Sequence, residues 1–163
     1  MPKDSFLQKR VDFWVKVYGL YGRSNYVIHD SRYVEKVYVV LDLKRYGEDD
    51  RQRAINEKIN TISTSLERFA KGKNEIRNEL DGIIYKLFSD LTGANKYRNA
   101  ISRIRVQRGL REDFKDAVIR AGTYLPITEN VFKIMKLPIE LTRLAYVESM
   151  FNVKAVSKAG AVG

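Results

Sequence analysis

Apolar residues recur at helical spacing along much of the chain, and this pattern predicts a mainly α-helical protein. The first stripe predicts a helix that Gly19 and Gly22 would end; it consists of Leu7, Val11, Trp14, Tyr18 and Tyr21. Two further stripes predict a pair of antiparallel helices joined at residues 71–73, with Gly72 as the C-cap of the first. Their members are Ile55, Ile59, Ile62, Leu66 and Phe69, followed by Ile76, Leu80, Ile83, Leu87 and Leu91.

A different pattern interrupts the helices at about residues 25–43. Two short runs rich in β-branched and aromatic residues, 26–29 and 37–41, lie on either side of a polar segment and predict a small β-hairpin. His29 lies at a strand end beside Asp30. A structural role in the turn is the first expectation for this histidine, and a pH response is the second.

Helical spacing continues from the pair of antiparallel helices toward the C-terminus. It predicts a basic helix over residues 95–108 and a further helix ended by Gly122. Thr128 suits the N-cap of a short helix, and Pro138 suits the first position of the last one. The apolar stripe of this last helix consists of Leu141, Leu144 and Ala145, and the next position at the same helical spacing is Glu148.

Composition narrows the classes of function. Thirty Lys and Arg against twenty Asp and Glu give a net charge of +10, which favours an anionic partner such as nucleic acid, an acidic membrane surface or a cell-wall polymer. The absence of Cys and the single His exclude disulfides, zinc fingers and multi-histidine metal sites. No apolar run approaches the roughly 20 residues that span a bilayer. The N-terminus lacks the apolar region of a secretory signal, so either the protein is cytoplasmic or a signal has been removed.

Glu148 is the residue whose position suggests chemistry. The helical count places it on the inward side of the last helix, close to the C-terminal end, and both circumstances disfavour the charged carboxylate and would raise its pKa. A carboxylic acid that stays protonated near neutral pH can act as a general acid on a glycosidic bond. The alternative is a glutamate at a frayed helix end, turned toward water. Glu140, near the start of the same helix, is explained by the favourable helix dipole and is assigned no chemistry.

Several segments of the last third of the chain resemble one enzyme family in the same order. They are residues 107–109, 122–126, 137–141 and 146–152, followed by 155–163. Together they resemble the start of the catalytic domain of lytic murein transglycosylases, in the branch of the membrane-bound type D and soluble enzymes with a goose-lysozyme-like fold. The resemblance implies a helical N-terminal region with a hairpin over residues 1–106 and the first helices of a lysozyme-like domain over residues 107–163.

The resemblance also implies roles for individual residues. Glu148 would be the single catalytic acid and base, cleaving the bond between N-acetylmuramic acid and N-acetylglucosamine with formation of a 1,6-anhydro product. Ser149 would help to orient the acid or the substrate. Turn and groove-lining positions would be Asn152, Ser157, Gly160 and Gly163. No cofactor or metal is implied, the partner is peptidoglycan, and the location is the periplasm or cell envelope.

Two features depart from the family pattern. Met150 stands where a small residue is common, and Val153 stands where proline is common. Family members also continue beyond the position of Gly163 with groove segments that complete the sugar site. The 163-residue chain alone is therefore expected to have little or no activity.

Two other functions remain open from the sequence. A helical nucleic-acid-binding module could use the basic residues between Lys96 and Arg111, among them Arg98, Arg103 and Arg105. A non-catalytic wall-binding or scaffold protein could share the lysozyme-like fold, because a fold does not fix an activity.

Overall fold

A computed structural model describes residues 5–154 and 160 of the chain. Over these residues the protein is mainly helical and contains a three-stranded antiparallel sheet, which confirms the predicted fold class of a mainly α protein with a small β-hairpin. The chain divides into two compact units, Met1–Gly109 and Leu110–Gly163. The boundary expected from the sequence, after residue 106, falls inside strand β3 (Ile104–Arg108).

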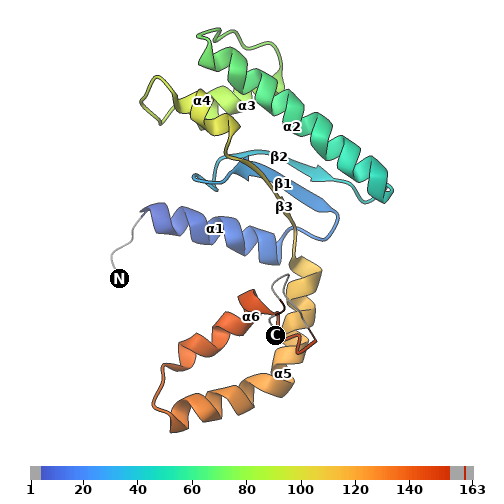
Figure 1. Ribbon diagram of the computed structural model, residues 1–163, viewed down its shortest axis with the longest axis vertical. Helices are drawn as coiled ribbons and strands as arrows, with labels where there is room; N and C mark the ends of the chain where they lie inside the picture. The colour runs from blue at the N-terminus through green and yellow to red at the C-terminus, as the bar shows by residue number, and fades with distance from the viewer. Residues whose placement is uncertain (1–4, 155–159, 161–163) are drawn as a thin grey trace. The chain divides into compact units, whose positions relative to one another are not determined.

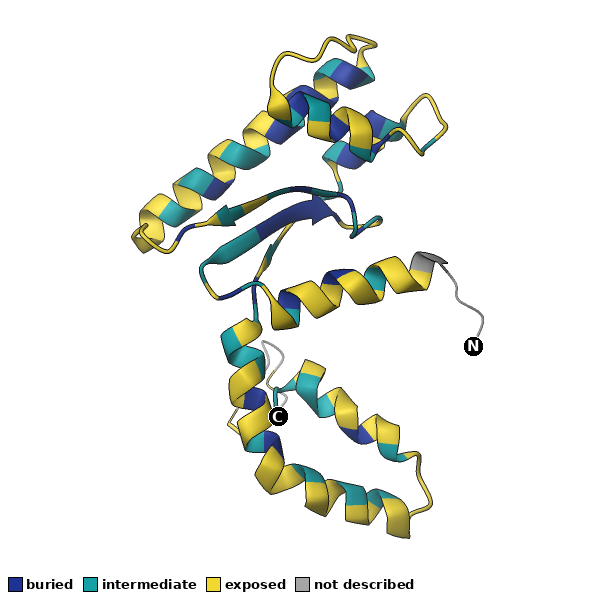
Figure 2. Cartoon of the chain, turned by 180° about the vertical axis from the view of Figure 1, so that it is seen from behind, coloured by how far each residue is buried: buried dark blue, intermediate teal, exposed yellow. Residues whose placement is uncertain are grey.

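The N-terminal unit is built on the sheet, whose strand order is β2-β1-β3. Strands β1 (Asn25–Asp30) and β2 (Val37–Asp42) form the predicted hairpin, and β3 pairs antiparallel with the other edge of β1. In β1 the residues from 27 to 30 are all buried, which Figure 2 shows as a dark blue strand. A central strand covered on both faces has this burial pattern, because neither set of alternating side chains reaches water.

Helices cover the two faces of this sheet. Helix α1 (Ser5–Gly19) lies along one face, and the other face carries α2 (Glu48–Ala70), α3 (Glu79–Leu87) and α4 (Lys96–Ile101) (Figure 1). The main core lies on the second side, and its buried members are Ile28, Tyr38, Ile62, Leu66, Phe69, Ile84, Phe88, Tyr97 and Ala100.

Helix α2 confirms the stripe predicted for it. Ile55, Ile62, Leu66 and Phe69 are buried, and Ile59 packs against the core. Gly72 follows the C-cap Lys71 with a φ of 75°, a left-handed conformation that glycine adopts at little cost.

Helix α1 forms as predicted but buries another face. Phe13 and Val17 are buried against the sheet, whereas Leu7, Val11 and Trp14 of the predicted stripe are exposed. The helix carries apolar residues around much of its circumference, so its period alone does not identify the side that meets the sheet.

Helix α3 is shorter than predicted, and its predicted stripe is confirmed only in part, since Leu80, Leu87 and Leu91 pack against the core. Ile84 and Phe88 enter the core, while Ile76 and Ile83 are exposed. The Asn78 side chain accepts a hydrogen bond from the backbone N–H of Asp81 at 3.0 Å and so starts the helix there. The buried Asp81 carboxylate pairs with Arg68 of α2, which fixes the rotation of α3.

The segment 95–108 is not one helix, which corrects the prediction from the sequence. Helix α4 ends at Ile101, and Ile104 to Arg108 form β3 instead. The alternation of β-branched Ile104 and Val106 with polar residues suits a strand, and the unpaired edge of β1 supplies its partner.

The C-terminal unit contains α5 (Arg111–Ile134), a 3₁₀ helix η1 (Ile139–Leu144) and α6 (Ala145–Glu148). Helix α5 runs through both Gly122 and Pro126, where a helix end and a new N-cap at Thr128 were expected. Figure 1 shows it bending in its middle. Pro126 lacks the N–H that would bond to the Gly122 carbonyl, and Thr128 Oγ1 donates to the carbonyls of Tyr124 and Leu125 at 2.9 and 3.0 Å, so the helix continues with a kink.

Candidate functional site

Glu148 is the last residue of α6, and its side chain is exposed. The expectation that this carboxylate lies on the inward side of the last helix is therefore wrong. The same correction applies to its predicted apolar neighbours, because Leu141 and Leu144 are 46% and 55% exposed.

The 3₁₀ geometry of η1 explains which face is buried instead. In a 3₁₀ helix residues three apart lie above one another, so Ile139, Thr142 and Ala145 share a face. Thr142 is buried, and the other two are half-buried. The sequence analysis assumed an α-helical period, which places Leu141, Leu144 and Glu148 on the buried face. In the observed 3₁₀ helix and the short helix after it, these three residues are exposed.

A well-held turn follows Glu148. The Arg120 guanidinium of α5 donates two hydrogen bonds to the Met150 carbonyl, from Nε at 3.0 Å and from Nη2 at 2.9 Å. The Phe151 N–H donates to the Ala145 carbonyl at 3.2 Å, and the Asn152 N–H donates to the Ser149 carbonyl at 2.9 Å. These bonds fix the backbone that leaves the end of α6.

Two residues of this turn have left-handed backbone conformations. The φ angles of Met150 and Phe151 are 52° and 53°. Non-glycine residues adopt this region at a cost, and such strain persists only where the surroundings impose it. Here the Arg120 bonds and the aromatic packing of Phe151 impose it.

Aromatic rings anchor the turn to the helices. The Phe151 side chain is buried, and its ring lies 4.7 Å from that of Tyr146 in an edge-to-face arrangement. The Tyr146 ring in turn lies 5.5 Å from that of Phe114 on α5. These contacts join α5, α6 and the turn into one small apolar cluster.

The other residues assigned to the site are distributed unevenly. Ser149 is half-buried directly beside Glu148, and Asn152 is exposed, with its Oδ1 accepting a hydrogen bond from the Lys154 N–H at 3.1 Å. Gly160 is exposed and has a φ of 84°. Ser157 and Gly163 lie outside the described residues. The structure thus brings Glu148, Ser149 and Asn152 together around one turn.

The basic segment expected for nucleic acid does not form a single helical face. Arg103 pairs with the buried Asp30, its Nε lying 2.9 Å from Oδ2, and the Lys96 ammonium donates to two backbone carbonyls. Arg105 Nη1 donates to the carbonyls of Ser102 and Ile104. Much of the basic segment therefore stabilises the N-terminal unit itself.

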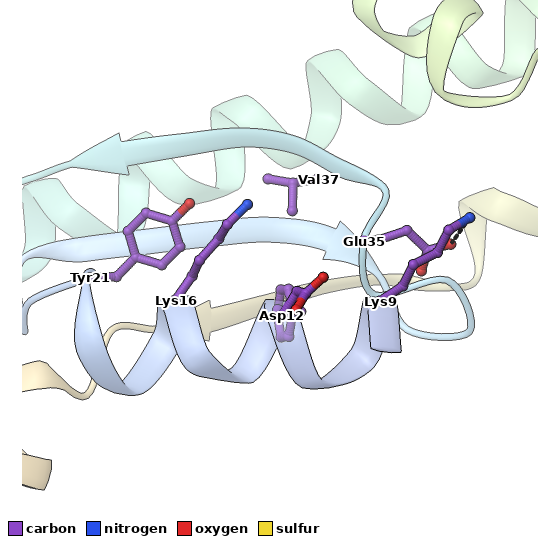
Figure 3. Close-up of a pocket in the computed structure, with 7 residues that line it drawn as sticks. Lys9, Asp12, Lys16, Tyr21, Glu35 and Val37 are labelled. Atoms are coloured by element: carbon purple, nitrogen blue, oxygen red, sulfur yellow. Dashed lines mark ion pairs between the residues drawn. The ribbon is translucent and has the colours of Figure 1, made fainter. Parts of the chain in front are cut away.

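A cavity of about 260 Å³, which the sequence analysis did not predict, lies between α1 and the hairpin (Figure 3). Its lining carries charges of both signs. Lys9 Nζ lies 3.8 Å from Glu35 Oε1, and Asp12 accepts a hydrogen bond from Gln8 at 2.8 Å. Because the helix and the hairpin meet only in the fold, no motif in the sequence could have indicated this cavity.

His29 is buried between α1 and the sheet. Its ring lies 4.6 Å from that of Phe13, and Nδ1 lies 3.1 Å from the Asp30 carbonyl oxygen. Burial disfavours the charged imidazolium and lowers the pKa of His29 below its ordinary value of 6.5, although the hydrogen bond to Asp30 and its charge oppose the shift.

Two aspartates take part in ion pairs with lowered pKa values. Burial alone would raise the pKa of Asp81, but hydrogen bonds from the Arg77 N–H, Ser65 and Arg68 hold it below its ordinary value. A hydrogen bond from the buried Lys36, at 2.5 Å, lowers the pKa of Asp90.

No group of three or more His, Asp or Glu side chains among the described residues could hold a metal ion. Within the same residues, no helix has both the length and the apolar character needed to cross a membrane. Comparison with protein-family models, curated proteins and solved structures finds no match to this chain.

Proposed function

We propose that the protein is a lytic transglycosylase of peptidoglycan in which Glu148 acts as the single general acid and base. The proposal rests on the resemblance of residues 146–152 to the catalytic motif of that family. The observation that carries it is the turn directly after Glu148, which Arg120 and Phe151 hold. Glu148 itself lies at the exposed end of α6 and not in the sheltered position expected from the sequence. A carboxylate so placed is accessible to a polymer as large as a glycan strand.

The backbone of the turn supports the proposal independently. Left-handed conformations at non-glycine residues concentrate at active sites, and here two consecutive ones follow Glu148. The family pattern has a small residue at the position of Met150. A φ of 52° is a conformation that the smallest residue, glycine, adopts without strain.

The proposed reaction uses one carboxyl group twice. Glu148 donates its proton to the glycosidic oxygen as the bond from that oxygen to C1 of the muramic acid breaks. The carboxylate then accepts the proton of the muramoyl 6-hydroxyl while the oxygen of that hydroxyl bonds to C1. This step closes the 1,6-anhydro ring and returns Glu148 to its protonated form. General acid–base catalysis contributes about 10²–10⁴-fold. Because the attacking hydroxyl belongs to the substrate, no second carboxylate is required.

The exposure of Glu148 sets a condition on this mechanism. The bound glycan has to cover Glu148 and exclude water from it while the proton is transferred. Peptidoglycan as the partner also suits the net charge of +10, because its peptide stems carry carboxylates. The proposed location is the periplasm or cell envelope.

The test compares two isosteric variants of the same helical segment. Purified sacculi are incubated with the full-length protein, and released 1,6-anhydromuropeptides are quantified. Glu148→Gln removes the proposed acid, and Glu140→Gln is the matched control because Glu140 is also exposed, on η1. We expect Glu148→Gln to lower release at least about 100-fold and Glu140→Gln to leave it unchanged.

Two outcomes would overturn the proposal. One is release of anhydromuropeptides that persists in Glu148→Gln, which would place the chemistry elsewhere. The other is the absence of release from every form of the protein, together with undiminished retention on sacculi. That result would favour the wall-binding scaffold on the same fold.

A further inference from the structure

A second cavity in the N-terminal unit, of about 290 Å³, has a lining that contains cations and no carboxylate. It lies between the turn after β1 and the loop before α4. Polar side chains of its lining include those of Arg32, Tyr33, Asn95, Lys96, Asn99 and Arg103. Gly93, which also lines the cavity, has a φ of 145°, a conformation that L side chains rarely adopt.

Three cations gather around the ring of Tyr33. The guanidinium carbons of Arg103 and Arg32 lie 5.3 and 5.5 Å from its centroid, and Lys36 Nζ lies 5.8 Å away. Arg103 is balanced by the buried Asp30, and Lys36 is balanced by Asp90. Arg32 has no carboxylate partner among the described residues.

Lys96 adds a second unbalanced charge to the same cavity. Its Nζ donates to the carbonyl oxygens of Phe88 and Leu91 at 2.8 and 2.9 Å. An ammonium group has three donors, so one remains after these two bonds, and neither carbonyl carries a compensating charge. Arg32 and Lys96 thus bring two positive charges to the cavity without a carboxylate in its lining, which favours the entry of an anion.

We propose that this cavity binds the carboxylates of the peptide stems of peptidoglycan, an inference that rests on the function proposed above. Arg32 supplies a planar guanidinium that can hold both oxygens of a carboxylate. The ammonium of Lys96 supplies a point charge, and the side-chain amide of Asn99 supplies a neutral donor. The site would hold a stem peptide on the N-terminal unit.

The main test introduces one negative charge into the cavity without changing side-chain shape. Asn99 is exposed on α4, so Asn99→Asp is expected to fold, and Asn60→Asp on the exposed face of α2 is the control with the same change in net charge. The 163-residue chain is titrated with an uncrosslinked tetrapeptide stem, with the same peptide after amidation of its carboxylates, and with inorganic phosphate. Binding is followed by amide chemical shifts.

We expect the free stem to shift the amides of the loop 91–95 and Asn99→Asp to weaken its binding at least about tenfold. Asn60→Asp should change it by less than about twofold, in line with the screening of distant charges. Arg32→Gln, compared with Arg45→Gln, gives a second pair of variants that removes a cation instead of adding an anion. Equal binding of the amidated stem, binding of phosphate alone, or equal effects of the two aspartate variants would each overturn the inference.

The result is separable from that of the Glu148 test. Stem binding does not require turnover, so it can persist in Glu148→Gln and in a protein that releases no anhydromuropeptides. Conversely, an enzyme that requires Glu148 but is indifferent to Asn99→Asp in stem binding would keep the proposed function and lose this site.

Discussion

Asp30 and Arg103 form a buried ion pair between residues 73 positions apart in the sequence. The Asp30 carboxylate is fully buried, and its Oδ2 lies 2.9 Å from Arg103 Nε. Its Oδ1 accepts hydrogen bonds from the N–H groups of Arg32 and Tyr33 at 2.8 and 3.1 Å. One side chain thus holds the turn of the hairpin and the chain that enters β3.

Removal of Arg103 should therefore destabilise the N-terminal unit strongly. In Arg103→Met the Asp30 carboxylate stays buried without its cation, and the expected loss of unfolding free energy is about 3–5 kcal/mol. Arg98→Met is the control because Arg98 is exposed on α4, and it should change stability by less than about 0.5 kcal/mol. Urea denaturation measures both. Equal losses in the two variants would contradict the importance of the pair.

His29 should make stability depend on pH near neutrality. Its pKa is lowered in the folded protein, so as pH falls below about 6.5 the unfolded chain takes up a proton that the folded chain resists. The stabilisation is complete above this pH and decreases below it. The urea midpoint of the wild type should be lower at about pH 5.5 than at about pH 7.5, and this difference should be smaller in His29→Gln. The lowered pKa values of Asp81 and Asp90 confine their effects to more acidic pH, so an unchanged pH dependence in His29→Gln would exclude this role of His29.

Gly109 and Gly122 should respond oppositely to the same substitution. A Cβ at Gly109 would lie 2.3 Å from the Gly22 carbonyl oxygen, and two backbone segments would have to separate. Gly109→Ala should therefore cost about 1–3 kcal/mol. A Cβ at Gly122 would have no neighbour within 4 Å, and Gly122 lies inside α5, so Gly122→Ala should add about 0.5–1 kcal/mol. Thermal unfolding followed by circular dichroism compares them, and destabilisation by Gly122→Ala would mean that the helix is interrupted there.

Met150 should be replaceable by glycine with a gain in stability. An L side chain in the left-handed region costs about 1–2 kcal/mol. Glycine removes this strain, but it also makes the unfolded chain more flexible, which offsets part of the gain in stability. The expected net gain for Met150→Gly is about 0.5–1 kcal/mol. Met135→Gly is the control, because Met135 has a φ of −79° and no strain to relieve. A gain in the control as large as in Met150→Gly would show that backbone strain is not the cause.

The sequence predicts the fold where one periodicity determines the structure. Both strands of the hairpin and the buried face of α2 follow from residue pattern alone, since β-branched alternation and a clean apolar stripe each allow one interpretation. The prediction fails where a partner distant in sequence decides. β3 exists because β1 offers an edge, and α3 is rotated by the pair of Asp81 with Arg68.

The candidate site shows the same division. The end of a helix at Glu148 and the turn after it could be expected from the motif, but the exposure of the carboxylate could not. That exposure depends on whether residues 139–144 wind as a 3₁₀ or an α-helix, a difference that apolar spacing does not report. The basic cavity was equally hidden, because its lining comes from two segments about sixty residues apart that only the fold brings together.

The late position of β3 has a consequence for biosynthesis. The central strand β1 is made early, but its second neighbour and the cation for Asp30 are translated only after α2, α3 and α4. The nascent chain must therefore hold a hairpin with an open edge and an unneutralised aspartate until residue 108 has left the ribosome. Such long-range strand pairing slows folding and leaves the edge available for wrong partners. A pause in translation before β3 is complete would expose the protein to aggregation, whereas a pause after β3 has paired with β1 would not.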